Sequence, residues 1–223
     1  MADPTAARAE MLDRIRSALE RSGRGRASPP PQRDGNPALD PRTPTALLAR
    51  FTERLESVGG RLHRAADGSA AARALATIIH ECGARSVATS DSPLVRRLAA
   101  CLPADVSCFD GWSDRERLFT ADIGLSSAQA AIAETGTLVL ESSAERHRLV
   151  SLVPPVHVAV LRIGAIAPDL GAALAALDRG QGQARAVTLI TGPSRTADIE
   201  LELVVGVHGP RALHVVVIEE QSA

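Results

Sequence analysis

Between residues 43 and 100, hydrophobic positions recur at the three- and four-residue spacing of amphipathic helices. The first predicted helix opens with Thr43 and Pro44 and ends before Gly59 and Gly60. A second helix carries apolar residues up to its stop at Gly83, and a third runs from 92 to 98. One more helix is predicted over residues 168–179, where leucines and an alanine share a single face.

Short apolar runs alternate with these helices and predict β-strands. Helices that alternate with apolar strands indicate a mostly parallel, Rossmann-like α/β sheet with helices on both faces. The predicted strands are RLHRA (61–65), SVATS (86–90), VSCFD (106–110), IGLSS (123–127), TLVLE (137–141), VHVAVL (156–161), AVTLI (186–190) and LHVVVIE (213–219).

The first forty residues have a different pattern. Residues 6–21 place apolar side chains at helical spacing among arginines and acids, which indicates an amphipathic helix. Residues 22–37 are rich in Gly, Pro, Ser and Arg and cannot bury enough surface to fix a conformation. We therefore expect a helical arm and flexible linker over residues 1–40, and one domain over residues 41–223.

Composition excludes several chemistries. The formal net charge is -1, and all 25 basic residues are arginine. Without lysine the chain has no Schiff-base, pyridoxal-phosphate or Walker-type lysine. The balanced charge and the 2% aromatic content argue against nucleic-acid binding. Arginine remains available to grip a carboxylate or phosphate in bidentate fashion.

The cysteines and histidines give no sign of a metal or redox centre. Cys82, Cys101 and Cys108 show no C-x-x-C spacing, and we expect them to be reduced and buried. The six histidines form no H-x-x-x-H pair, so we expect no bound metal and no cofactor in this chain. The start of the sequence lacks the apolar core of a signal peptide, and no run is long enough to span a membrane. These features predict a cytoplasmic protein.

The stretch TGPSRTADIE (191–200) directly follows a predicted strand. In open α/β sheets, ligands collect beyond the carboxyl ends of the strands, so polar residues at that point are candidates for a site. A hydroxyl pair, a guanidinium and the turn backbone suit a carboxylate or phosphate. The alternative is a surface turn in which a hydroxyl caps the next element and Arg195 pairs with Asp198. The candidate ligand-binding residues are Gly192, Ser194, Arg195, Thr196, Asp198 and Glu200.

Two further stretches carry candidate chemistry. In AETGTLVLE, Thr135, Gly136 and Thr137 stand at the start of a strong strand and, together with His208 of GVHGP, are further candidate ligand-binding residues. Glu134, beside this glycine turn, suits a nucleophile or general acid/base. A β-bulge with a solvated glutamate would have the same pattern. In GVHGP, His208 between glycines could act as an acid/base, although single histidines are more often structural. We expect His157, on a strand, to be a hydrogen-bonded and half-buried structural residue.

Four ordered motifs resemble one known family. AIAETGTLVL, VPPVHVAVL, ITGPSRTADIE and GVHGPRALHVVVI are similar, in order and spacing, to the lactate-utilisation protein C family, whose domain is called LUD. The resemblance covers about residues 43–220. It implies a fold like that of the NagB/RpiA/CoA-transferase group and a role in bacterial oxidation of L-lactate to pyruvate.

The resemblance also implies a division of labour. This chain would be a non-redox subunit that binds a small anionic ligand, while partner proteins carry the iron-sulfur clusters. The alternative is a stand-alone CoA-transferase-like or isomerase-like enzyme, or a binding protein, for an acyl-CoA or sugar phosphate. In that alternative Glu134 would be the catalytic candidate.

Overall fold

The computed structural model describes residues 8, 10–14, 16–17, 43–111, 113–142, 148–177, 186–197, 203–206 and 208–220. The chain divides into two compact units, Met1–Asp40 and Pro41–Ala223. In the first unit the described residues are helical, and the side chains of Arg16 and Asp13 form an exposed ion pair at 3.0 Å. Such a pair contributes little to stability. The predicted linker lies outside the described residues.

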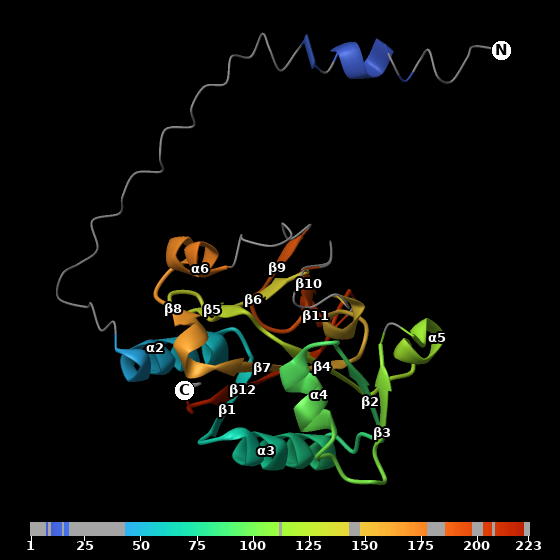
Figure 1. Cartoon of the computed structure of the whole chain (residues 1–223), viewed down its shortest axis with the longest axis vertical. Helices are drawn as coiled ribbons and strands as arrows, with labels where there is room; N and C mark the ends of the chain where they lie inside the picture. Colours follow the sequence, from blue (N-terminus) through green and yellow to red (C-terminus); the bar gives the residue numbers. More distant parts are fainter. Residues whose placement is uncertain are drawn as a thin grey trace. The chain divides into compact units, whose positions relative to one another are not determined.

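The second unit is built on a six-stranded sheet in which every neighbouring pair is parallel (Figure 1). The prediction of a mostly parallel α/β sheet is confirmed. The predicted strands all agree with observed ones within one residue at each end. The strand order is β1 (Arg61–Ala65), β12 (Ala212–Ile218), β7 (Val156–Arg162), β4 (Ile123–Ser127), β2 (Ser86–Thr89) and β3 (Ser107–Asp110).

Helices cover both faces of this sheet. On one face, α3 (Gly68–Glu81) and α4 (Pro93–Ala99) pack on alternate strand residues, and on the other face α2 (Pro44–Ser57) does so. α2 and α4 begin and end within two residues of their predictions, and α3 ends within two residues of its predicted stop at Gly83. The short α5 (Arg115–Leu118) was not predicted. α6 (Leu170–Ala176) begins two residues later than predicted because the Asp169 carboxylate accepts a hydrogen bond from the Ala172 amide at 2.8 Å.

A second, four-stranded sheet lies above the first in Figure 1. Its order is β8 (Ile166–Ala167), β5 (Ala130–Ile132), β6 (Thr137–Glu141) and β9 (Val187–Ile190). The stretches TLVLE and AVTLI were expected in the parallel sheet, but here they pair antiparallel as β6 and β9. The reason lies in the connection before β6: only residues 133–136 separate β5 from β6, which is too short for a parallel crossover.

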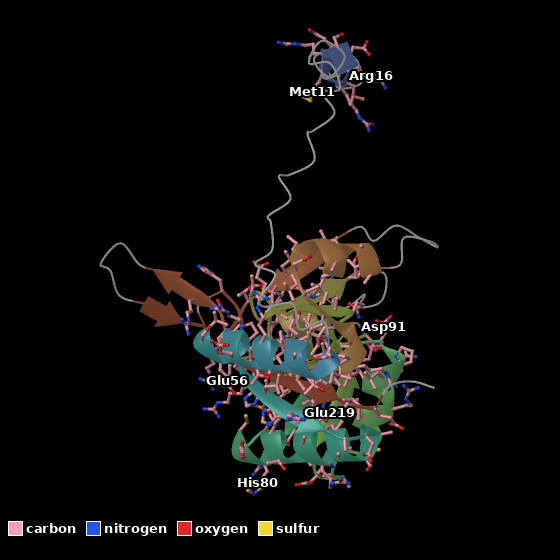
Figure 2. The ribbon with its side chains drawn as sticks, turned by 90° about the vertical axis from the view of Figure 1, so that its left-hand side faces the viewer. Met11, Arg16, Glu56, His80, Asp91 and Glu219 are labelled. Atoms are coloured by element: carbon pink, nitrogen blue, oxygen red, sulfur yellow. The ribbon has the colours of Figure 1, made fainter. Side chains whose placement is uncertain are left out.

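Smaller elements complete the domain. The 3-10 turns η2 (Arg148–Ser151) and η3 (Ile163–Ala165) flank β7, and β10 (Arg195–Ala197) pairs antiparallel with β11 (Leu203–Val205). In Figure 2 the β10–β11 hairpin projects from the body. No helix in the described parts of the chain combines the length and apolar character that a bilayer crossing requires.

The expectation of buried cysteines is wrong. All three are free and exposed. Cys82 is the C-cap of α3, Cys101 follows α4, and Cys108 lies on β3 at the edge of the sheet. An apolar neighbourhood in the sequence therefore does not bury a residue that stands at a helix end or on an edge strand.

Candidate functional site

The TGPSR turn, residues 191–195, is fastened to the end of α2. Gly192 has φ +81°, and a Cβ atom there would lie 2.7 Å from the Val58 carbonyl oxygen. Only glycine combines this backbone conformation with such a close approach. The Arg195 guanidinium donates from Nη2 to the same carbonyl at 2.9 Å. The helix end therefore fixes both the turn and the arginine.

The HGP stretch joins this turn through backbone hydrogen bonds. The amide of Ser194 donates to the Pro210 carbonyl at 2.8 Å, and the amide of Gly206 donates to the Ser194 carbonyl at 2.9 Å. A Cβ atom on Gly209 would lie 3.2 Å from the Cβ of Ser194. Two stretches that the sequence singled out separately are thus brought into contact, and the Ser194 amide is not available to a ligand.

The ETGT stretch is the tip of the β5–β6 hairpin. Gly136 has φ +68°, and a Cβ atom there would lie 2.4 Å from the backbone nitrogen of Leu55 in α2. Two hydroxyl contacts of 2.7 Å each connect Thr135 to Thr137 and Thr137 to Thr191. The ETGT and TGPSR turns are therefore neighbours that rest on the same helix.

A pocket of about 320 Å³ opens beside the TGPSR turn. This volume is at the small end of the roughly 300–1,000 Å³ found for ligand sites. Both sheets contribute to its lining: β9 comes from the four-stranded sheet, and the second residues of β7 and β12 come from the parallel sheet. It is lined by Ser151, Leu152, His157, Thr188, Leu189, Ile190, Thr191, Gly192, Pro193, Ser194, Arg195, His208, Gly209, Pro210 and Leu213.

The position of this pocket corrects the strand-end argument. His157 and Leu213, which are paired in register, are each the second residue of a parallel strand. The pocket therefore lies at the amino edge of the parallel sheet. TGPSR reaches that edge because the strand before it, β9, belongs to the second sheet. TGPSR was expected at the carboxyl edge of the sheet, and that expectation is wrong because it applies only to parallel strands, whereas β9 pairs antiparallel with β6.

His157 is a pocket residue that sequence reasoning treated as structural. It is 1% exposed rather than half-buried, and its Nε2 atom is hydrogen-bonded to the Ser126 hydroxyl at 2.8 Å. Its Nδ1 atom is buried and has no hydrogen-bond partner. Burial lowers the pKa of His157 from 6.5 to about 4, so the ring is neutral at pH 7. The strand pattern of VHVAV predicted its place but not this unpaired nitrogen.

A second buried histidine lies on the opposite face of the sheet. On β12, Leu213 and Val215 face the pocket side of the sheet, and His214 between them faces the other side. The His214 ring stacks on that of His63, with ring centroids 5.2 Å apart. The His214 Nδ1 and His63 Nε2 atoms are 3.0 Å apart. Burial, then the neighbouring His63, lower the pKa of His214 to about 4. In this pair the Nδ1 atom of His214 has the Nε2 atom of His63 as its partner, whereas the Nδ1 atom of His157 has none.

The predicted site residues are thus divided by the structure. Gly192, Ser194, Arg195 and His208 line the pocket, and Thr135 and Thr137 connect to its wall through Thr191. Glu134 is exposed and is not among the lining residues. The side chain of Thr196 and all of Asp198 and Glu200 lie outside the described residues, so the predicted Arg195–Asp198 pair does too.

The described lining suits an anion. Arg195 is its permanent cation, and none of the described lining residues is acidic. Hydroxyls from Ser151, Thr191 and Ser194 and the imidazole of His208 add hydrogen-bonding groups. Within the described parts of the chain, no three His, Cys, Asp or Glu side chains gather as a metal site would require. The arrangement can hold a small carboxylate by charge and by several hydrogen bonds.

Comparisons with known proteins agree with this architecture. The family model of the LUD domain matches residues 48–218. A protein named lactate utilization protein C from an Exiguobacterium strain is 37% identical over 62% of this chain and 63% of its own length. Another of the same name, from Halalkalibacterium halodurans, is 33% identical over 65% of this chain and 68% of its own length. The matched part thus spans slightly less than two thirds of the first relative.

A solved structure shows the same fold. The crystal structure of a DUF162 family protein from Deinococcus radiodurans superposes with a TM-score of 0.59 over 80% of this chain and 99% of that chain. The two sequences are 24% identical. At that identity the likeness concerns the fold alone.

Proposed function

Because the chain belongs to the LUD domain family, whose model matches residues 48–218, we propose that it serves lactate utilisation as a ligand-binding subunit. The names of the two bacterial relatives support the pathway. The single observation that carries the ligand-binding role is the pocket whose described lining holds Arg195 and no acidic residue. We propose that this pocket binds a small carboxylate, and that L-lactate is the first ligand to test.

The proposed binding mode rests on the chemistry of the pocket. A guanidinium presents five N–H donors, and one of those on Arg195 is used by the Val58 carbonyl. The remaining donors can pair with a carboxylate in the fork geometry that arginine favours. The hydroxyls of Thr191 and Ser194 stand on the same turn and can complete the shell around the ligand. The buried and neutral His157 also belongs to the lining.

Replacing Arg195 with glutamine tests this mode. A hydrogen bond to a charged group contributes about 1.5–3 kcal/mol, so the Kd for L-lactate measured by calorimetry should rise roughly 10- to 100-fold. Arg211→Gln is the matched control, because Arg211 is also an exposed arginine and does not line the pocket. Thermal unfolding of each variant separates lost binding from lost folding. An unchanged Kd in Arg195→Gln, with the fold intact, would exclude this carboxylate site.

We further propose that the chain is the non-redox subunit of a complex that oxidises L-lactate, with iron-sulfur clusters on its partners. The absence of a cysteine cluster from the sequence supports a chain that leaves redox chemistry to other proteins. Purification of the tagged chain from lactate-grown cells should recover iron-sulfur proteins with their visible absorption, and deletion of the chain should impair growth on L-lactate. Recovery of the chain alone, together with normal growth after deletion, would refute this role.

A further inference from the structure

His157 combines three properties that a structural histidine does not need together. It is one of the residues that line the pocket, it is 1% exposed, and the buried Nδ1 atom of its ring has no hydrogen-bond partner. A buried polar atom without a hydrogen bond is rare in folded proteins and costs stability. A ligand in the pocket that hydrogen-bonds Nδ1 would remove this cost. The unpaired Nδ1 atom is therefore a hydrogen-bonding position that a ligand group can use.

The partner of the other nitrogen makes Nδ1 adaptable. The Ser126 hydroxyl, 2.8 Å from Nε2, can either donate to that nitrogen or accept from it. If Ser126 donates, Nδ1 carries the ring proton and is a donor; if Ser126 accepts, Nδ1 is an acceptor. Because burial lowers the pKa of His157 to about 4, the ring keeps a single proton and both arrangements are neutral.

A hydroxyl group is the chemical partner that fits such an atom. It can donate to Nδ1 or accept from it, whereas a carboxylate only accepts and is better served by Arg195. Given the proposed carboxylate site, on which this step rests, we propose that His157 binds the 2-hydroxyl of a 2-hydroxycarboxylate. His157 would then be the residue that distinguishes hydroxy acids from simple carboxylic acids of the same size.

The test compares two ligands that differ only in this group, L-lactate and propionate. A site built around a ligand hydroxyl rejects the analogue that lacks it, because its own polar atom is then left unpaired. The wild-type protein should therefore bind L-lactate at least about ten-fold more tightly than propionate. In His157→Phe the ratio of the two Kd values should fall to about one, through weaker lactate binding, while the propionate Kd stays the same.

His214→Phe is the matched control. It removes another buried histidine from the same sheet but on the opposite face, and His214 does not line the pocket. Its lactate-to-propionate ratio should equal that of the wild type. A ratio near one in the wild type, or an equal loss of both ligands in His157→Phe, would overturn the hydroxyl assignment and leave the carboxylate site standing. Failure of both ligands to bind the wild type would instead overturn the proposed function.

A measurement on the unaltered protein covers the case in which His157→Phe does not fold. With ¹⁵N-labelled histidine, the Nδ1 resonance of His157 should shift when L-lactate is added, because that atom gains a hydrogen bond. Saturating propionate should leave the resonance in place. The same shift with both ligands, or with neither, would contradict the assignment.

Discussion

The ETGT and TGPSR turns look alike in sequence and differ in the structure. Each has threonine, glycine and one long charged residue next to an apolar strand, and each packs a glycine of positive φ on α2. Yet the charged residue of the first turn, Glu134, is exposed outside the pocket lining, while that of the second, Arg195, lines the pocket and bonds to Val58.

The difference comes from the element that each turn leads into. ETGT closes a hairpin whose two strands stay within the small sheet. Its tip contacts α2, the Pro168 carbonyl and, through the Thr137 hydroxyl, Thr191 of the TGPSR turn. TGPSR leaves that sheet and meets the HGP segment, which leads into the parallel sheet. TGPSR therefore lines the pocket because it connects the two sheets. ETGT stays within one sheet and contacts the TGPSR turn without lining the pocket.

The largest expected effect is on the hairpin turn, at Gly136. Alanine there must adopt φ +68° and place its Cβ 2.4 Å from backbone atoms of α2, which cannot move as a side chain can. We expect Gly136→Ala to lower the free energy of unfolding by about 3 kcal/mol, as measured by urea denaturation. Gly164→Ala, where a Cβ meets nothing within 4 Å, should change it by less than about 0.5 kcal/mol. Equal stability of the two variants would mean that the turn does not rest on α2.

A comparable loss of unfolding free energy is expected when the pH falls, because of His157 beside the pocket. Burial lowers the pKa of His157 from 6.5 to about 4. Between these two pH values the unfolded chain binds a proton at this residue and the folded chain does not. Stability is therefore complete above pH 6.5 and falls as the pH drops toward 4, by roughly 3 kcal/mol for this residue. His214 contributes in the same direction.

Urea denaturation between pH 7 and pH 4 measures this dependence. His157→Phe should show a shallower decrease of unfolding free energy than the wild type, and the same applies to His214→Phe. If stability stays level across this range in the wild type, the buried histidines are not held neutral in the folded state.

The smallest expected effect concerns the hairpin turn again. Glu134→Gln should leave lactate binding within about two-fold of the wild type, because Glu134 is exposed and not among the described lining residues. Surface substitutions of this kind usually change stability by no more than about 0.5 kcal/mol. A loss of binding or turnover as large as that expected for Arg195→Gln would show instead that both turns act on the ligand, and would revive the carboxylate role considered for Glu134.

Much of the fold could be predicted from local sequence patterns. Thr43 and Pro44 predicted the start of α2, and glycines predicted the ends of α2 and α3, because helix caps depend on residues adjacent in sequence. The division of strands between two sheets could not be seen in the sequence, since TLVLE and IGLSS are both short strands that are buried along their whole length. Pairing depends on partners distant in the sequence. The elements of two or three residues, β8 and β10 among them, are too short to show a period.

The site shows the same limit. Polar turns between apolar runs singled out TGPSR and HGP, because such residues stand out in sequence. His157 did not, since one histidine in a strand has the same pattern whether its ring is satisfied or not. Its significance depends on Ser126, thirty-one residues away, and on the unpaired nitrogen. Such a residue can be found only once the strands are aligned.

The contact between Arg195 and the end of α2 has a further consequence for affinity. A long, flexible side chain normally loses about 0.5–1.5 kcal/mol of conformational freedom when a ligand immobilises it. Here the Val58 carbonyl already holds the guanidinium at 2.9 Å before any ligand arrives. The entropic cost of ordering the arginine is therefore met during folding, and α2 makes the pocket preorganised for its anion.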